Sequence, residues 1–143
     1  MPREYGTPQE WMDYARADLA LAAIPLPAGV RYQQLCCHAQ QAAEKALKAV
    51  LIHREIEFPR THAIAALLDM LPEDLPRTDE LRRATKLTGY ATFLKYPVED
   101  ATLTEERWRE LVGLARAVVE WAEDATSAPP PSEQGSARSS GLD

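Results

Sequence analysis

The sequence of 143 residues contains few glycines and few cysteines, six and two respectively. The glycines are scattered and make no spaced set, which excludes a glycine-rich loop for phosphate binding. Cys36 and Cys37 are adjacent in a predicted helix, where a disulfide between neighbours is geometrically poor, and two thiols alone do not complete a zinc site. We therefore expect two reduced thiols, with Cys36 nearer the core.

The sequence also has little with which to bind a metal ion. Its three histidines, His38, His53 and His62, form no His-x-x-x-His pair, and no Glu-x-x-His motif supports a di-iron site in a helical bundle. We expect neither a metal site nor a cofactor. The amino terminus has no apolar run, so neither a signal peptide nor a membrane span is expected, which predicts a cytoplasmic protein.

A strongly basic composition is absent as well. The net charge is -6 at pH 7, and the segment from Thr126 onward contributes -1 of it through Glu133, Asp143 and Arg138, which leaves -5 for the rest of the chain. Proteins that hold nucleic acid by bulk electrostatics normally have a basic face. Any contact with RNA is therefore expected to be local.

Helical periodicity is what the sequence does contain. The spacing of apolar residues, together with proline and threonine at the expected helix ends, predicts helices over about 8–23, 30–53, 61–71, 78–93 and 104–124. No window alternates with period two for long enough to form a strand. Thr7, Thr61 and Thr104 are the expected N-caps of three of them. The prediction is an all-α, up-and-down antiparallel helical bundle of four to five helices over residues 1–125, with a disordered tail at 126–143.

The helix expected at 30–53 has a stripe of small residues with a polar ridge beside it. Four alanines in the stripe let neighbouring helices approach closely; its members are Leu35, Ala39, Ala42, Ala43, Ala46 and Val50. The ridge contains Arg31, His38, Gln41, Lys45 and Lys48. Glu44 is spaced to pair with Lys48, although Gln40, Glu44 and Lys48 could equally be only the solvated face of a surface helix.

Asp18 interrupts the apolar stripe of the first predicted helix. The inward residues expected there are Trp11, Tyr14, Ala15, Leu19 and Ala22. A carboxylate inside that stripe must be paired or hydrogen-bonded, because an isolated buried charge costs several kcal/mol. Its expected partners are Arg31, His38, Lys45 or the pair Lys95 and Tyr96. The alternative is that the helix twists enough to bring Asp18 to the edge of the core.

These residues together suggest a family. The segment Cys37-His-Ala-Gln-Gln-Ala-Ala-Glu-Lys-Ala-Leu-Lys-Ala49 resembles the second-helix signature of HEPN domains. Three further features follow the family's order: Trp11 to Leu19, Thr61-His62, and Tyr90 followed by Lys95-Tyr96-Pro97. The resemblance implies a bundle of four or five helices, frequent dimerisation, and a gene partnership with a minimal nucleotidyltransferase in which the pair resembles a toxin and antitoxin.

The resemblance also raises the question of catalysis. Some HEPN branches are metal-independent endoribonucleases with an Arg-Asn-x-x-x-His setting, which this chain lacks. Where one branch has Arg-Tyr-Pro this chain has Lys95-Tyr96-Pro97, and lysine loses the bidentate fork of arginine. Arg31 and His38 match the spacing of a catalytic pair, in which the imidazole would move a proton and the guanidinium would stabilise charge. His62 could bind phosphate near a helix N-terminus or could only pack at a loop corner.

Three functions remain open at this point. In the first, the protein is a dimeric module that docks a nucleotidyltransferase and holds a nucleotide or RNA in a polar cleft; the expected binding residues are Asp18, His38, Gln41, Lys45, His62, Lys95 and Tyr96. In the second, it is a metal-independent RNase toxin whose candidate catalytic residues are Arg31, His38 and His62. In the third, it is a structural helical interaction module. The missing Arg-Asn-x-x-x-His setting favours the first.

Overall fold

The computed structural model describes residues 6–90 and 103–129, and these residues form helices without any strand. Three long helices are α1 (Pro8–Ala22), α2 (Tyr32–His53) and α5 (Glu105–Ser127). The chain between the second and third of these forms α3 (Ile64–Asp69), α4 (Asp79–Arg83) and the 3-10 helix η2 (Ala84–Tyr90). Within the described residues, no helix combines the length and apolar composition that crossing a membrane requires.

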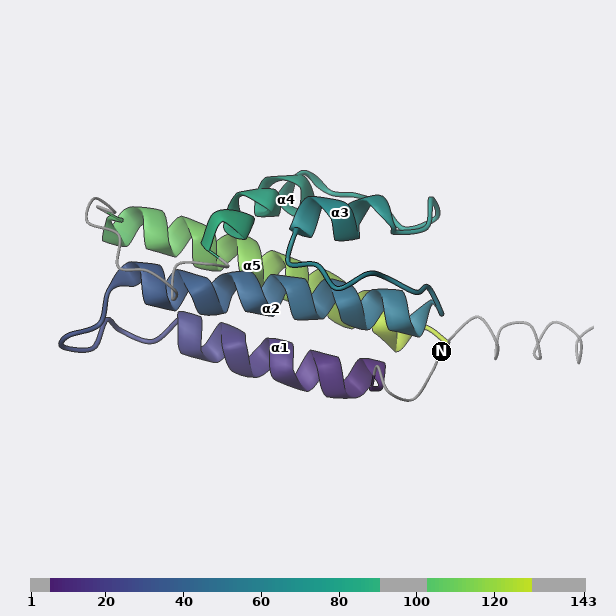
Figure 1. The fold of residues 1–143 in the computed structure, drawn as a ribbon, viewed down its shortest axis with the longest axis horizontal. Coiled ribbons are helices and arrows are strands. Elements are labelled where there is room, and N and C mark those ends of the chain that lie inside the picture. The colour runs from purple at the N-terminus through teal and green to yellow at the C-terminus, as the bar shows by residue number, and fades with distance from the viewer. Residues whose placement is uncertain (1–5, 91–102, 130–143) are drawn as a thin grey trace, which may run out of the picture.

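The helices are arranged up and down. Figure 1 shows α2 between α1 on one side and the layer of α3 and α4 on the other, with α5 alongside. α1 runs opposite to α2 and α5, and the layer that contains α3, α4 and η2 carries the chain back along α2. The all-α, up-and-down bundle predicted from the sequence is confirmed. Its third leg, residues 64–90, consists of the short helices α3, α4 and η2.

α2 is the central helix of this bundle. It packs against α1, α3, η2 and α5, and 17 of its 22 residues are buried. All six residues of the predicted small-residue stripe are among them, and none is more than 4% exposed. Alanine leaves little side-chain volume between backbones, so the long helices can lie close on both sides of α2.

The N-cap of α1 and the turn that follows this helix lie where the sequence predicted them. The Oγ1 atom of Thr7 accepts a hydrogen bond from the backbone N–H of Glu10 at 3.1 Å, which confirms the expected N-cap. After α1 ends, the N–H of Val30 donates to the carbonyl of Pro27 at 3.1 Å and closes a turn. Gly29 has φ +81° at the third position of this turn, a conformation that favours glycine.

The buried face of α1 is rotated relative to the predicted one. Tyr14 was expected to point inward but is 65% exposed, whereas Met12 is 1% exposed and takes part in the core. At 100° per residue, Tyr14 lies about 40° beyond Asp18 around the helix, and Asp18 already stands at the edge of the buried arc. The prediction for Tyr14 was therefore wrong, and its ring lies on the surface.

Trp108 joins the first and last helices. Its Nε1–H donates to the backbone carbonyl of Ala22 at 2.8 Å, and its ring stacks on Tyr32 with 5.3 Å between centroids. The carbonyl of Ala22 belongs to the last turn of α1, where it has no partner within its own helix. The C-terminal end of α1 is thus fixed against the beginning of α5.

The third leg differs most from prediction. α3 begins at Ile64, so Thr61 is not its N-cap; the hydroxyl of Thr61 accepts from the N–H of Ala63 at 3.0 Å, and that of Thr88 accepts from the N–H of Ile64 at 3.1 Å. Within the described residues, the helix expected over 78–93 is α-helical at α4 and continues as η2 to Tyr90. Residues 91–93 lie outside the described part of the chain. Two threonines and a glycine in η2 are weak helix formers, which accounts for the early end of α4.

The C-terminal boundary also differs slightly. α5 begins at the predicted cap, where the Oγ1 of Thr104 accepts from the N–H of Arg107 at 3.1 Å. It continues to Ser127, past the expected end near Asp124. The first two residues of the expected tail at 126–143 are therefore helical, and residues 130–143 lie outside the described part of the chain.

Both cysteines are buried and free, as predicted. Burial raises the pKa of the Cys36 thiol to about 12 and also raises the pKa of Cys37. The thiolate is the reactive form of cysteine, so a raised pKa makes a thiol a poor nucleophile. These two side chains lie in the core of the bundle as poorly nucleophilic thiols.

Candidate functional site

The first polar network of the site joins α1 to α2 through Asp18. This residue is only 7% exposed, and its Oδ1 lies 3.1 Å from Nδ1 of His38 while its Oδ2 accepts from Nζ of Lys45 at 2.5 Å. His38 and Lys45 are two turns apart on the same face of α2, so their side chains converge on one carboxylate. Asp18 is thus buried at the edge of the core and paired, with two of the four expected partners in contact.

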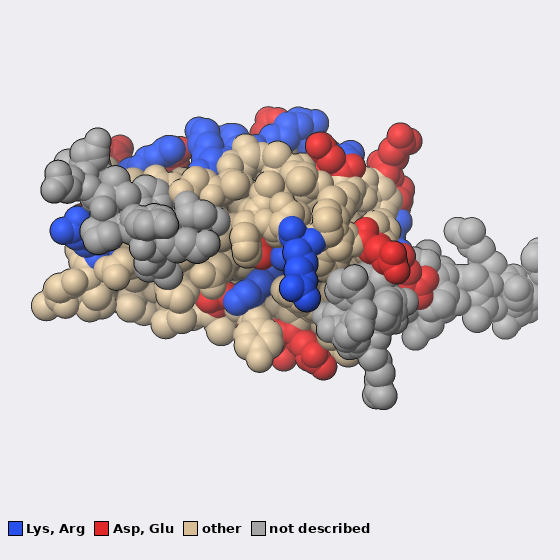
Figure 2. All heavy atoms as spheres, in the orientation of Figure 1, with Lys and Arg blue, Asp and Glu red and all other residues tan. Residues whose placement is uncertain are grey.

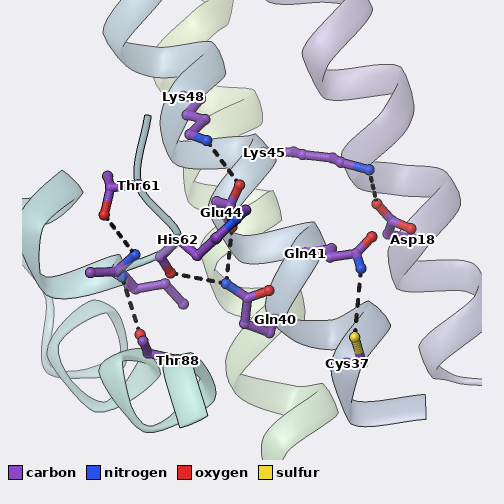
Figure 3. Close-up of polar contacts among 12 residues, drawn as sticks. Asp18, Cys37, Gln40, Gln41, Glu44, Lys45, Lys48, Thr61, His62 and Thr88 are labelled. Carbon is purple, nitrogen blue, oxygen red and sulfur yellow. Dashed lines mark hydrogen bonds and ion pairs between the residues drawn. The ribbon is translucent and has the colours of Figure 1, made fainter. Parts of the chain in front are cut away.

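The second network has the carboxylate of Glu44 at its centre. Oε1 of Glu44 accepts from Nε2 of Gln40 at 3.0 Å and lies 2.9 Å from Nδ1 of His62. Oε2 accepts from Nζ of Lys48 at 2.9 Å, which is the pair predicted from their spacing. Figure 3 shows these three side chains converging on Glu44, with Lys45 and Asp18 on the other side of the view.

The interpretation of Gln40, Glu44 and Lys48 as solvated surface was wrong. Their exposed fractions are 1%, 6% and 7%, because the chain after α2 folds back over this face of the helix. Gln40 also donates to the backbone carbonyl of His62 at 3.1 Å, which fixes that returning segment to α2. Nζ of Lys48 lies 5.7 Å from the ring centroids of Trp11 and Phe58, so the cation is covered by aromatic rings.

None of these three residues was among the predicted site residues. The one signal in the sequence is their spacing of four, which places an amide, a carboxylate and an ammonium in line along the helix, where they can pair with one another. The spacing does not show that another segment covers them.

The environment of Glu44 favours its ionised form. Burial by itself would raise the pKa of this carboxyl, but hydrogen bonds from Lys48, Gln40 and His62 outweigh that effect and lower the pKa below its ordinary value. Glu44 is consequently a carboxylate at neutral pH. It can hold a hydrogen-bond donor on each side, including the imidazole of His62.

His62 extends from this buried centre to the surface. Its side chain is 74% exposed, and its Nδ1 faces Glu44, so Nε2 is the ring nitrogen directed to solvent or a ligand. The two backbone N–H groups that follow His62 directly are already engaged. The N–H groups of Ala63 and Ile64 already donate to the hydroxyls of Thr61 and Thr88. Any anion here would meet the imidazole.

The other predicted site residues that the structure describes take no part in the contacts of these two networks. Nε2 of Gln41 donates to Sγ of Cys37 at 3.6 Å, on the strip of α2 between His38 and Lys45. Arg31 is the N-cap residue of α2, about 10 Å along the helix axis from His38, whose contact is with Asp18. Lys95 and Tyr96 lie outside the described residues. The predicted cleft thus corresponds to two networks on either side of an accessible strip of α2.

The chemistry available to these networks is that of paired carboxylates and histidines. In the described part of the chain, no group of three or more His, Cys, Asp or Glu side chains gathers where it could hold a metal ion. Each carboxylate instead contacts one lysine and one histidine. A carboxylate on Nδ1 fixes the orientation of the ring and presents Nε2 for a hydrogen bond or a proton transfer.

Figure 2 shows one face of the molecule, on which the charge is mixed. Basic side chains near the middle of this face lie close to acidic ones, and several basic side chains gather along the upper edge. A groove of about 320 Å³ lies elsewhere, between α1 and α5, and none of the predicted binding residues lines it. The polar networks are therefore distinct from the hollow between these two helices.

Comparison with known proteins extends these observations. A HEPN domain family model matches residues 8–125. The crystal structure of TT1696 from Thermus thermophilus is similar, with 31% identity over 87% of this chain and 99% of that one and a TM-score of 0.71. The crystal structure of ST0689, an archaeal HEPN homologue, is also similar, with 28% identity over 84% of this chain and 98% of that one and a TM-score of 0.65.

No curated protein matches this chain significantly. The HEPN match nevertheless covers all five α-helices except the last two residues of α5. It includes both polar networks. The protein belongs to the HEPN domain family.

Proposed function

We propose that this HEPN domain binds a nucleotide or RNA along the accessible strip of α2 and acts with a minimal nucleotidyltransferase in a toxin-antitoxin-like module. Membership of the family supports a nucleotide- or RNA-related function in general. The observation that carries the proposal is the position of His62, an exposed imidazole whose Nδ1 is held by a buried carboxylate. A ring oriented in this way can donate to, or accept from, a ligand through Nε2.

The local charge is compatible with a phosphate. The two carboxylates of the networks are matched by two lysines, and two histidines add donors, so the site has no net negative charge in a chain of net charge -6. Lys45 keeps 26% of its side chain exposed and His38 keeps 34%. Both can therefore reach a ligand on α2 without leaving Asp18.

A metal-independent endoribonuclease is the second candidate. The observation in its favour is that a carboxylate faces Nδ1 of both exposed or half-exposed histidines, an arrangement that prepares Nε2 as a general base. Nε2 of His62 or His38 would take the proton of an RNA 2′-hydroxyl as that oxygen attacks the adjacent phosphorus. The P–O5′ bond then breaks, the 5′-oxygen leaves with a proton from water, and a 2′,3′-cyclic phosphate remains. The missing Arg-Asn-x-x-x-His setting, and the place of Arg31 at the helix start, weigh against it.

Binding and cleavage are tested with the same protein variants. We would titrate labelled RNA and mononucleotides into the wild type, His62→Ala and Lys45→Ala, with Arg60→Ala as a control that removes an exposed cation two residues from His62. The proposal expects weaker binding in the first two variants and none of this loss in the control. Equal binding by all four proteins would put the ligand outside these networks, and no binding by the wild type would point to a purely structural interaction module.

RNA cleavage in the presence of a chelator separates the two functional candidates. Cleavage by the wild type that is lost in His38→Ala or His62→Ala would establish a nuclease and identify its histidine. Binding without cleavage is the outcome expected of a binding module. The comparison is informative because neither histidine is buried, so both variants should fold.

The partner and the oligomeric state are part of the same proposal. The protein would be a homodimer that forms a stable complex with the minimal nucleotidyltransferase encoded in its own genome. Co-expression followed by light scattering on a sizing column measures both masses. A monomer that elutes apart from the nucleotidyltransferase would contradict this part of the proposal and leave nucleotide binding unaffected.

A further inference from the structure

Tyr14 is an aromatic side chain that the packing of the bundle does not explain. It is 65% exposed on α1, the largest exposed fraction among the exposed large hydrophobic side chains of the described residues. Trp11, one turn earlier on the same helix, packs against the core. The ring of Tyr14 is consequently available to a ligand.

The neighbours of Tyr14 belong to the first polar network. Nζ of Lys45 lies 5.5 Å from the centroid of the Tyr14 ring and also holds the carboxylate of Asp18. Asp18 follows Tyr14 by one helical turn, and His38 contacts the same carboxylate. The ring therefore lies against a cation whose position is fixed by Asp18.

We propose that Tyr14 is a stacking platform for one unpaired nucleobase of a single-stranded RNA, with Lys45 facing the phosphate of the same nucleotide. This inference rests on the proposed function and specifies the ligand of that site. Aromatic rings beside basic side chains hold single-stranded nucleic acid with little sequence preference, since every base has a flat face to stack. A base can reach such a ring only when it is free of a duplex.

The charge of the molecule agrees with this kind of ligand. A duplex binder relies on many phosphate contacts over a basic surface, which a chain of net charge -6 does not favour. Stacking supplies affinity that does not depend on net charge. One exposed ring with one cation beside it is suited to a single nucleotide of a flexible strand.

The test compares two substitutions at Tyr14 in the full chain. Tyr14→Leu keeps an apolar side chain but removes the flat ring, whereas Tyr14→Phe keeps the ring and removes only the hydroxyl. We would measure fluorescence anisotropy with a short labelled single-stranded RNA of mixed sequence, and competition by AMP and by ribose 5-phosphate. The expected result is binding weakened about ten-fold in Tyr14→Leu and nearly unchanged in Tyr14→Phe.

The competitors show whether the base is what Tyr14 recognises. AMP should compete less well against Tyr14→Leu than against the wild type, and ribose 5-phosphate, which has no base, should not distinguish the two proteins. Equal RNA binding by the wild type and Tyr14→Leu would overturn the stacking inference alone. An equal loss in Tyr14→Leu and Tyr14→Phe, or duplex RNA bound as tightly as single strands, would also overturn it. A wild type that binds neither RNA nor AMP would overturn the proposed function as well.

Discussion

Glu44 and His62 form a pair in which the carboxylate is buried and the imidazole is exposed. The two groups are 2.9 Å apart, yet 8% of one side chain and 74% of the other are accessible. The buried partner therefore contributes to the stability of the bundle, and the exposed partner contributes a surface group for a ligand. Substitutions at these two positions should separate stability from binding.

Glu44→Gln should destabilise the fold strongly. The substitution keeps the shape of the side chain but leaves the ammonium of Lys48 buried without a counter-charge, which costs about 3–5 kcal/mol in unfolding free energy. Urea denaturation at pH 7 measures this. Glu123→Gln is the matched control, because its pair with Arg16 is about 40% exposed on both sides and should contribute no more than about 1 kcal/mol. Similar losses in both variants would contradict the buried network.

The stability of the protein should fall with acid in a way that depends on Glu44. Its pKa is lowered in the folded state, so its contribution is fully present above the pKa of the unfolded carboxyl and is lost as pH falls through the lower folded pKa. Urea denaturation from pH 7 to pH 3 should show a steeper loss in the wild type than in Glu44→Gln. Asp74 and Glu110 also have lowered pKa values beside arginines, and both proteins retain them. Identical pH profiles would rule out this role.

Glu55→Gly should stabilise the protein. The N–H of Ile56 donates to the carbonyl of Leu51 at 2.8 Å and that of Glu55 donates to Ile52 at 3.0 Å, which is the Schellman arrangement at the end of α2. Glu55 has φ +61° there, a left-handed conformation that costs a residue with a Cβ about 1–2 kcal/mol. We expect a gain of about 1 kcal/mol by thermal unfolding for glycine and no gain for Glu55→Ala.

Ala42→Leu should disrupt the close approach of helices at α2. Ala42 has no exposed surface, and added volume in a filled core costs roughly 1–3 kcal/mol. Ala17→Leu, at an exposed position of α1, adds the same atoms where there is room and should change stability by less than about 0.5 kcal/mol. An unchanged melting temperature in Ala42→Leu would count against the packing described for this helix.

The parts of the fold that the sequence predicted are those with a strong helical period. The alanine stripe of α2, the cap at Thr7 and the pairing of Asp18 follow from spacing and from the cost of an isolated charge. The short third leg was predicted less well. Six residues of α3 and five of α4 give too few turns to establish a period, and the N–H of Ile64 at the start of α3 donates to Thr88, which lies elsewhere in the chain.

The errors at the site have a similar cause, because helical periodicity does not show how neighbouring segments pack. Gln40, Glu44 and Lys48 are buried because the chain that follows α2 and, for Lys48, Trp11 of α1 cover them, and periodicity within α2 cannot show which of its polar residues another segment will cover. The exposure of Tyr14 depends on the exact phase of α1, where a shift of about 40° moves a side chain from the core to the surface. Both errors concern side chains at the edge of a buried arc.

The hydrogen bond from Trp108 to Ala22 affects the order in which the protein can be completed during synthesis. The two residues are 86 positions apart, so the carbonyl at the end of α1 gains this partner only after most of the chain has left the ribosome. α1 and α2 can associate earlier, but a pair of helices without α5 leaves apolar surface on both of them open to water. Native assembly of this bundle is therefore a step that follows translation of its last helix.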